Sequence, residues 1–355
     1  MQNLEEIIKG IRPVDRQAME ETWRCWDSLC KPLRGLGWLE EALVQIAGIC
    51  GTSRPHPDRR AVVIMGADNG VVKEGVTQTD SSVTIQVLEN MGDRLSTACV
   101  MCGLAGCELI PVNIGSLTDG KHPRIRNRVV RHGTGNIAEG PAMSREECIQ
   151  AILTGADVVR GLKEEGYDLI VTGEMGIGNT TTSSAVAAAL LQCEIDSVTG
   201  KGAGLSDAGL FCKRQVIAEA MEKYHLYHAD ALTVLMTVGG LDIAGLVGIC
   251  IGGALFHVPI VLDGVISMAA ALLAERIVPG TKAYLLPSHR GKEPAAKWIA
   301  EELGLEPVID AKLALGEGTG AVMLFPLLDM ALCVYRDKMT FENLQIEQYK
   351  RFEIK

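Results

Sequence analysis

The chain has 355 residues, of which 47% are hydrophobic, so it is long enough for one large domain with an appendage or for two domains. The formal net charge is −10 and no basic cluster occurs, which argues against a nucleic-acid partner. No apolar run reaches 18 residues and the first ten residues lack a long apolar core, so we expect neither a membrane span nor a signal peptide. The 11 cysteines are scattered through apolar runs, which favours a cytoplasmic location.

The pattern of apolar residues changes once along the chain. In the first sixty residues they recur at three- and four-residue steps, which predicts helices at 15–29 and 38–49. Beyond the polar segment 51–60, short apolar runs predict buried strands at 61–65, 108–114, 168–171, 259–262, 283–286 and 307–309. The helices predicted between and after these strands are 83–104, 144–163, 180–191, 208–223, 241–256, 265–275, 293–303 and 321–335.

Strands that alternate with helices favour an α/β fold, in which a mostly parallel sheet of six strands carries helices on both faces. Ser144, followed three residues later by Glu147, predicts a capping box at the start of one helix. In such sheets a ligand binds beyond the carboxyl ends of the strands. The segments that follow the predicted strands are polar and rich in glycine: 66–70, 115–116, 173–176, 263–264, 287–290 and 315–320.

A glycine-rich loop joins the third predicted strand to a helix. Gly176 and Gly178 allow the backbone to approach a ligand, while Asn179 and Thr180 lie in the first helical turn, where backbone N–H groups are unpaired. This arrangement predicts phosphate binding without a cation. The spacing G-x-x-G-x-G differs from the dinucleotide-binding fingerprint and from a Walker A loop. A tight turn with a threonine N-cap is the alternative.

Glu317 is the candidate general base. It lies between Gly316 and Gly318, in the turn before an apolar helix. A carboxylate held among glycines and apolar groups tends toward a raised pKa, which suits a base near neutral pH. The alternative is an acid that only complements a helix dipole, worth about 0.3–1 kcal/mol.

Other polar residues follow the predicted strands and loops. Lys213 lies in the first turns of the helix after a second glycine-rich loop and could reach a phosphate, although a solvated surface lysine is the commoner outcome. Asp263 would cap a helix or accept hydrogen bonds from ribose hydroxyls, and Gly264 allows close approach of the backbone. Ser288 is interpreted as a phosphate or ribose contact, whereas the role of His289 is left open.

Cys99, Cys102 and Cys107 form a cluster on a helix predicted at 96–105. No second pair follows at the spacing of a zinc site. We therefore expect buried structural thiols there and no metal.

Five segments together carry a resemblance to a known family: 173–181, 238–245, 262–264, 287–289 and 315–321. They read Gly-Glu-Met-Gly-Ile-Gly-Asn-Thr-Thr, Val-Gly-Gly-Leu-Asp-Ile-Ala-Gly, Leu-Asp-Gly, Pro-Ser-His and Leu-Gly-Glu-Gly-Thr-Gly-Ala. The chain resembles the nicotinate-nucleotide:5,6-dimethylbenzimidazole phosphoribosyltransferases, which make the lower ligand of cobalamin. The match runs in order over about residues 1–335, so it is much more specific than any single motif.

The resemblance implies a Rossmann-like domain at 59–320 and a small helical domain built from both termini, 1–58 and 321–355, in a homodimer. It also implies the transfer of phosphoribose from nicotinate mononucleotide to an aromatic base, with inversion from β to α at the anomeric carbon. The departing nicotinate carries a quaternised ring nitrogen and needs little acid catalysis. The incoming benzimidazole must lose its N–H proton, so one base is the minimum apparatus. This chemistry requires no metal or other cofactor.

The resemblance also places functional residues. It makes Glu317 the general base. The expected nucleotide- and phosphate-binding residues are Glu174, Gly176, Gly178, Asn179, Thr180, Gly202, Gly204, Lys213, Asp263, Gly264 and Ser288. The expected base pocket consists of Thr79, Val87, Met175 and Leu315.

Three positions depart from the family pattern. Asn69 stands where the family usually has His, and Thr79 and Val87 stand where many members have Ser and Gln in the pocket for the aromatic base. A less polar wall could admit phenol or p-cresol, which some relatives use, sometimes as a complex of two paralogous chains.

Three alternatives to benzimidazole transfer therefore stay open. One is the same transfer to a phenolic acceptor, which would give an O-glycoside. Another is a catalytically silent paralogue that supports a partner subunit, against which the presence of Glu317 counts. The last is an unrelated nucleotide-binding oxidoreductase, which the absence of a G-x-G-x-x-G motif disfavours.

Overall fold

The computed structural model describes residues 9–337 and 339–350. Within them a single parallel sheet has the strand order β3-β2-β1-β4-β5-β6. Its strands are β1 (Arg60–Ala67), β2 (Glu108–Gly115), β3 (Arg126–Asn127), β4 (Leu169–Met175), β5 (Ile260–Leu262) and β6 (Leu285–Pro287). The chain moves to one side of β1 through β2 and then returns to its other side through β4. The sheet therefore has its topological switch point between β1 and β4, where ligands bind in open α/β sheets.

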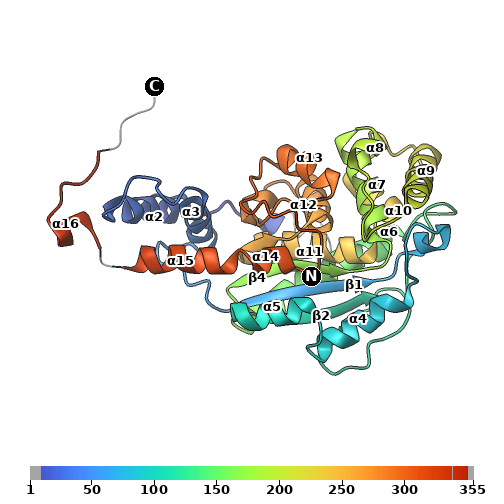
Figure 1. Cartoon of the computed structure of the whole chain (residues 1–355), viewed down its shortest axis with the longest axis horizontal. Coiled ribbons are helices and arrows are strands. Elements are labelled where there is room, and N and C mark those ends of the chain that lie inside the picture. The colour runs from blue at the N-terminus through green and yellow to red at the C-terminus, as the bar shows by residue number, and fades with distance from the viewer. Residues whose placement is uncertain (1–8, 338, 351–355) are drawn as a thin grey trace.

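Helices surround this sheet and extend beyond one end of it (Figure 1). The α-helices are α2 (Arg16–Ser28), α3 (Trp38–Cys50), α4 (Ser82–Gly92), α5 (Thr97–Ala105), α6 (Arg145–Glu164), α7 (Asn179–Leu191), α8 (Ile195–Val198), α9 (Asp207–Lys223), α10 (Ala231–Val238), α11 (Leu241–Phe256), α12 (Val265–Ile277), α13 (Pro294–Leu303), α14 (Thr319–Val322), α15 (Phe325–Arg336) and α16 (Phe341–Leu344). Two 3-10 helices are η1 (Gly70–Glu74) and η2 (Thr281–Tyr284). The capping box predicted at Ser144 and Glu147 is confirmed at the start of α6.

Strand β1 is buried along its whole length and contributes to two cores. Val63 and Met65 point into the core formed with α6, α10, α11 and α12, whereas Val62 and Ile64 point into the core formed with α3, α4, α5 and α15. This alternation places apolar residues on both faces of one strand, as a parallel sheet covered on both faces requires. The predicted α/β class and its helices on both faces are confirmed.

Helix α11 is buried almost completely and is apolar on all sides. It packs against α6 at very short range because Gly155 and Gly248 lack side chains, and a Cβ at either position would collide with the opposite backbone. A helix that is hydrophobic all round is buried in this way. The close packing fixes the N-terminal end of α11, and with it Asp242, beneath the loop that follows β4.

Residues from both ends of the described chain pack together. Trp26 of α2, Leu43 and Val44 of α3, and Ala331 and Leu332 of α15 form a core separate from the two sheet cores. Figure 1 shows these helices beside the sheet, with α2 and α3 against α15. The residues 1–8 and 351–355 of the predicted terminal segments lie outside the described residues.

Some predicted elements differ from the structure. The run 307–309 was expected to be a strand, but only Ile309 pairs, in a single parallel bridge with His289; β3 supplies the sixth strand instead. The expected helix 83–104 is interrupted between α4 and α5, where Asp93 ends the first helix and Ser96 caps the second. A short polar break within a run of apolar residues is a weak signal for the end of a helix, so a sequence-based prediction easily misses it.

The expected helix 321–335 is divided into α14 and α15. The stretch Thr319–Arg336 is 18 residues long with a mean hydropathy of 1.4, which by length and composition alone would suffice to cross a membrane. Half of it is buried inside the protein, Phe325 and Leu328 lie in a sheet core, and Asp329 pairs with Arg60. These contacts are those of a core helix.

Candidate active site

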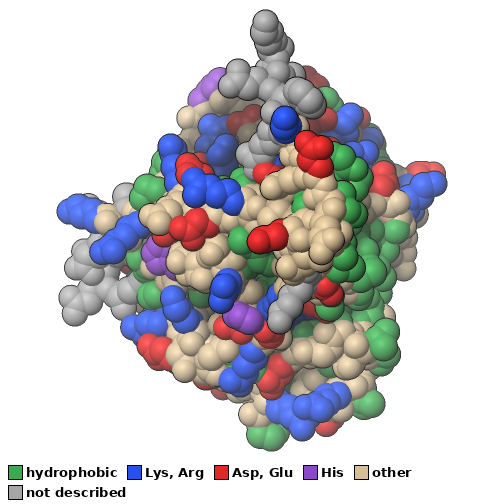
Figure 2. Space-filling view, turned by 90° about the vertical axis from the view of Figure 1, so that its left-hand side faces the viewer, with side chains coloured by type: hydrophobic (Ala, Val, Ile, Leu, Met, Phe, Trp, Pro, Cys, Tyr) green, Lys and Arg blue, Asp and Glu red, His purple; other side chains and the backbone are tan. Residues whose placement is uncertain are grey.

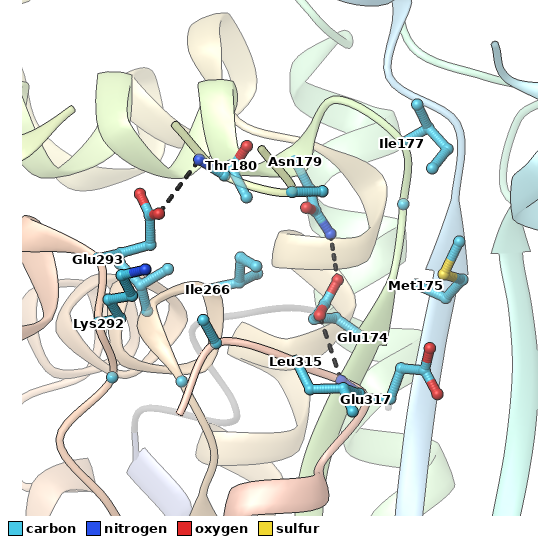
Figure 3. A pocket seen from close by; sticks show the side chains of 18 of the residues that line it. Glu174, Met175, Ile177, Asn179, Thr180, Ile266, Lys292, Glu293, Leu315 and Glu317 are labelled. Atoms are coloured by element: carbon cyan, nitrogen blue, oxygen red, sulfur yellow. Dashed lines mark hydrogen bonds between the residues drawn. The ribbon is translucent and has the colours of Figure 1, made fainter. Parts of the chain in front are cut away.

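A cavity of about 300 Å³ opens at the carboxyl ends of β4, β5 and β6. Figure 3 shows Glu174 near its centre, with Asn179 on one side and the turn that carries Leu315 and Glu317 on the other. Most of the predicted site residues line this cavity: Thr79, Glu174, Met175, Gly176, Gly178, Asn179, Thr180, Gly202, Asp263, Gly264, Leu315 and Glu317. Segments distant in sequence therefore meet in one place.

The loop after β4 is held against the switch point. A Cβ on Gly176 would collide with an Asp242 carboxylate oxygen, and Gly178 adopts a φ of +95°. The side-chain amide of Asn69 donates to the Asp242 carboxylate and to the Ile177 carbonyl, each at 3.4 Å. Glycine is therefore required at both positions, for close approach and for a left-handed backbone.

Glu174 is a buried carboxylate at the centre of the cavity wall. It accepts hydrogen bonds from the side-chain amide of Asn179 and, at 3.4 Å, from the backbone N–H of Glu317. Burial raises its pKa to about 8, assisted by the charges of Asp242 and Asp263. Near neutral pH the Glu174 side chain is therefore largely a neutral carboxylic acid.

Glu317 has an unusual backbone. Its φ is +58°, and its neighbours Gly316 and Gly318 have φ values of +86° and +75°. A left-handed conformation costs a non-glycine residue roughly 1–2 kcal/mol, and such strain persists where the surroundings hold it. One carboxylate oxygen, Oε2, is buried and has no hydrogen-bond partner among the described residues. Burial and then the charge of Asp263 raise the pKa of Glu317.

Asp263 organises the turn that carries Glu317. Its carboxylate accepts from the backbone N–H groups of Gly318 and Ala321, both at 3.1 Å. Asp263 thus binds the start of α14, a helix distant in sequence, whereas the helix that directly follows it, α12, has Gly264 as its N-cap and no side-chain cap. Glu174, Asp263 and Glu317, named here the carboxylate wall, therefore form one connected group on one side of the cavity.

A second group of residues lies on the side of α7. Lys213 is fully buried and its Nζ donates to the Thr180 hydroxyl at 2.9 Å and to the Gly200 carbonyl at 3.2 Å. Burial lowers its pKa to about 8, although the nearby Glu293 carboxylate opposes that shift. Thr180, Gly202 and Lys213 are named the anion wall, because their backbone and side-chain donors surround the N-terminus of α7.

Four predicted site residues do not line the cavity: Val87, Gly204, Lys213 and Ser288. Lys213 lies one layer behind Thr180, and Gly204 is exposed with its carbonyl accepting from Gln78. Val87 is half-buried on α4 and packs into a sheet core. Ser288 is buried and donates its hydroxyl proton to the Leu262 carbonyl.

Several lining residues were not predicted: Gln78, Ile266, Lys292, Glu293 and Leu313. Glu293 accepts from the backbone N–H of Gly202 at 3.1 Å and so faces the anion wall. In Figure 3, Glu293 and Lys292 lie on the side of the cavity opposite Met175. Lys292 and Glu293 lie two and three residues after the predicted strand-end segment 287–290, and this closeness in sequence was a signal that could have identified them.

The cysteine cluster lies elsewhere, on α5 and in the turn between α5 and β2. Cys102 is buried, while Cys99 and Cys107 are half-buried. The thiol of Cys102 donates to the sulfur of Cys107 and so lowers the pKa of Cys107. Among the described residues, no group of three or more His, Cys, Asp or Glu side chains is placed to hold a metal ion.

The two walls together can hold an anionic group and move a proton. In the first turn of α7 the N–H groups of Asn179 and Thr181 already donate to the carbonyls of Gly176 and Gly178, so Thr180 is the residue there that suits a phosphate. The half-buried, unpartnered carboxylate of Glu317 suits proton abstraction. A cavity of this size fits one nucleotide-sized ligand, with apolar side chains such as Ile266 and Leu315 available to a flat ring.

Comparison with known proteins agrees with this geometry. Residues 11–346 match the family model described as phosphoribosyltransferase. The chain is 43% identical to the nicotinate-nucleotide–dimethylbenzimidazole phosphoribosyltransferase of Clostridium acetobutylicum, over 98% of this chain and 99% of that protein. It is 40% identical to the protein of the same name from Halalkalibacterium halodurans, over 97% and 96% of the two chains.

A solved structure has the same fold. The crystal structure of CobT from Thermus thermophilus superposes with a TM-score of 0.88 at 37% sequence identity. The match covers 94% of this chain and 100% of that one.

Proposed function

The chain belongs to the nicotinate-nucleotide–dimethylbenzimidazole phosphoribosyltransferase family, and we propose that it transfers the phosphoribosyl group of nicotinate mononucleotide to an aromatic base. The products are an α-riboside 5′-phosphate and nicotinate. With a benzimidazole acceptor the riboside is α-ribazole phosphate, the nucleotide of the cobamide lower ligand. The chain is thus a pentosyltransferase of cobamide assembly.

The reaction balances with one protein base. The Glu317 carboxylate takes the N–H proton of the incoming benzimidazole, and the nitrogen lone pair so freed attacks the anomeric carbon of the ribose. The bond from that carbon to the nicotinate nitrogen breaks, and its electron pair returns to the pyridinium ring, which leaves as nicotinate. Attack from the face opposite to the leaving ring inverts the anomeric carbon from β to α.

The geometry of Glu317 carries this proposal. Its unpartnered Oε2 and its raised pKa favour uptake of a proton, and its turn is held in place by Asp263 and Glu174. The anion wall would hold the 5′-phosphate, with Thr180 at the α7 N-terminus as the donor, the helix dipole favouring negative charge there and Lys213 behind Thr180 supplying positive charge. Two flat rings on opposite faces of the ribose then need mainly positioning.

The direct test is to incubate the purified protein with nicotinate mononucleotide and 5,6-dimethylbenzimidazole and to identify the riboside by mass. We expect α-ribazole phosphate and an equal amount of nicotinate. Wild-type protein that releases nicotinate without a riboside, or that consumes no nucleotide, would remove the proposal.

The choice of acceptor is a finer question. Thr79 lines the cavity and provides a hydroxyl and a methyl group where many relatives have Ser. The amides of the lining residues Gln78 and Asn179 already donate to Gly204 and Glu174. A ring that cannot hydrogen-bond them therefore leaves neither of these donors unpaired, so phenol and p-cresol are alternative acceptors. Phenol has a pKa near 10 and must lose its proton to become a good nucleophile, so we expect it to react more slowly than benzimidazole.

We also propose that the chain forms a homodimer through an exposed apolar surface, with a heterodimer with a paralogue as the alternative. Exposed side chains on α5 and on the α14–α15 segment, which packs against it, are Val100, Leu104, Met323 and Met330, with exposed fractions of 70%, 93%, 41% and 58%. Figure 2 shows hydrophobic side chains in a band along one edge of the molecule. A contiguous band of this kind is typical of an interaction surface.

The oligomer proposal is tested by light scattering coupled to size exclusion. We expect twice the chain mass for the wild type and the chain mass for Leu104→Glu. If the wild type is monomeric by itself and forms a dimer only after it is mixed with a paralogous chain, the heterodimer is favoured.

We also propose that the chain divides into its two domains at 58/59 and 320/321. A cytoplasmic location is part of the same proposal. The core shared by α2, α3 and α15 supports a small helical unit built from both ends of the chain.

A further inference from the structure

His289 follows strand β6 and contributes to the lining of the cavity, yet the transfer described above does not use it. Its ring is buried, with 6% of the residue exposed, and it packs behind the turn that carries Glu317. A Cβ on Gly320 would collide with the imidazole, so the absence of a side chain there makes room for the ring. An imidazole fitted this closely into a substrate cavity has a fixed orientation.

The hydrogen bonds around His289 determine its tautomer. The Ser288 hydroxyl lies 2.6 Å from the Leu262 carbonyl, which can only accept, so the single hydroxyl proton of Ser288 is used there. Ser288 Oγ also lies 2.9 Å from His289 Nδ1 and must be the acceptor in that bond. Nδ1 therefore carries the proton, and the Asp263 carboxylate at 3.9 Å favours it there as well. In neutral His289 the lone pair consequently lies on Nε2.

No described residue forms a hydrogen bond with Nε2. The atom faces the backbone of Gly264, the last residue of the loop between β5 and α12, because a Cβ built on Gly264 would lie 3.8 Å from it. Both residues line the cavity. The cavity thus contains a fixed hydrogen-bond acceptor without a protein donor.

The surrounding charges indicate which ligand group this acceptor suits. Asp263 and Glu317 lie on the same side of the cavity, beside the largely neutral Glu174, and the negative charge of a carboxylate disfavours a phosphate there. A hydroxyl is neutral and donates a proton, so it matches a lone pair among carboxylates. The positive charge that a phosphate needs lies instead on the anion wall, where Lys213 donates to the Thr180 hydroxyl and leaves the proton of that hydroxyl for a ligand.

We propose that His289 Nε2 accepts a hydrogen bond from a ribose hydroxyl of the nucleotide substrate and so selects ribonucleotides over deoxyribonucleotides. This inference rests on the proposed function, since a phosphoribosyl donor supplies the hydroxyl. Ser288 is then a positioning residue that acts through His289 by fixing its tautomer. The Ser288 hydroxyl itself is committed to the protein.

The test compares kcat/KM for nicotinate mononucleotide and its 2′-deoxy and 3′-deoxy analogues, with 5,6-dimethylbenzimidazole as the acceptor. His289→Asn keeps an amide donor for Ser288 near the position of Nδ1 but removes the acceptor at Nε2. His289→Gln can place an amide oxygen near the position of Nε2. His257→Asn, at a half-buried histidine beside Tyr284, serves as the matched control.

We expect the wild type to prefer the ribonucleotide over one deoxy analogue by about tenfold or more, because that analogue leaves Nε2 unpaired. In His289→Asn the ratio of kcat/KM for the ribonucleotide to kcat/KM for that deoxy analogue falls close to one, while kcat/KM for the deoxy analogue itself is unchanged. His289→Gln restores part of the preference, and His257→Asn keeps all of it. Thermal unfolding of each variant verifies that it is folded.

Two results would overturn the inference while leaving the proposed function intact. In one, active wild type does not distinguish any of the three nucleotides. In the other, folded His289→Asn and His289→Gln lose the same factor with all three, which is the signature of a structural role. Wild type that transfers no phosphoribose at all would instead remove the proposed function, and this inference with it.

Discussion

The carboxylate wall and the anion wall face the same cavity, and burial changes their charges in opposite ways. Burial raises the pKa of Glu174 to about 8, and it lowers the pKa of Lys213 to about 8. Desolvation always penalises the charged form, so an acid and a base are both driven toward neutrality. The same physical cause therefore leaves a largely neutral acid, Glu174, on one wall and a weakened cation, Lys213, on the other.

The two walls also differ in how their side chains are satisfied. On the anion wall, Lys213 already donates to Thr180 and Gly200, so a phosphate would add to an existing network. On the carboxylate wall, Glu317 Oε2 has no partner among the described residues. A site that leaves one buried acceptor open is prepared for a proton from the substrate, whereas a satisfied donor network is prepared for positioning.

Removal of the base from the carboxylate wall should have the largest effect. We expect Glu317→Gln to keep the fold and substrate binding while lowering kcat by about 10²–10⁴-fold, the usual scale for loss of a general base. Steady-state kinetics measure this, with the exposed Glu301→Gln on α13 as a control that keeps full activity. Near-normal kcat in Glu317→Gln would exclude Glu317 from proton transfer.

Removal of the cation from the anion wall should weaken nucleotide binding and leave base binding unchanged. Lys213→Ala should cost about 1.5–3 kcal/mol of affinity for nicotinate mononucleotide, the scale of a charge-assisted hydrogen bond. Calorimetry with each substrate separately measures this, and the exposed Lys297→Ala is the control. An unchanged nucleotide affinity would show that Lys213 has only a structural role.

The opposite pKa shifts predict opposite slopes of stability against pH. Folded Glu174 holds its proton up to about pH 8, but the unfolded residue releases it near 4.5, so the folded state binds more protons in that window and stability falls as pH rises through it. Folded Lys213 loses its proton near pH 8 and the unfolded residue near 10.5, so there the unfolded state binds more protons and stability rises with pH.

Thermal unfolding across pH separates the two contributions. We expect Glu174→Gln to flatten the fall in Tm between pH 4.5 and 8, and Lys213→Met to flatten the rise between pH 8 and 10.5, each by a few degrees. If both variants keep the slopes of the wild type, other groups dominate the pH dependence.

The smallest expected effect concerns acceptor choice. Thr79 lines the cavity, whereas Val87 packs into a sheet core, so Thr79→Val should change the ratio of kcat/KM for benzimidazole and p-cresol by about tenfold or less. Val87→Gln should leave that ratio unchanged and lower Tm instead, because it buries an amide. A larger change in the ratio for Val87→Gln would place that side chain at the acceptor in the working enzyme.

Much of the site follows from local sequence. Gly176 and Gly178 mark a strand-to-helix loop because only glycine tolerates the close approach to Asp242 and the positive φ found there. Glu317 is conspicuous for the same reason, since glycines on both sides allow a left-handed turn. In both cases the backbone conformation is set by residues adjacent in sequence, so the amino-acid sequence is enough to predict it.

The remaining part depends on contacts between distant segments. Glu293 faces Gly202 from 91 residues away, and nothing near either residue in sequence indicates the pair. The tautomer of His289 depends on the Leu262 carbonyl, 26 residues before Ser288, and the opening for its ring depends on Gly320. The run 307–309 has the composition of a strand, but only Ile309 reaches the sheet.

The amino-acid sequence by itself determined the α/β class, the edge of the sheet that holds the candidate site, the glycine loops and the candidate base Glu317. Hydrophobic periodicity, turn chemistry and the steric freedom of glycine are set by neighbouring residues, so a sequence shows them directly. Only the tertiary structure decided that Lys213 lies behind Thr180, that the half-buried Val87 packs against a sheet core and that His289 presents an unpartnered nitrogen to the cavity. Burial and the partners of a polar atom are set by segments that meet only when the sheet has formed, and these two quantities determine its pKa and its chemistry.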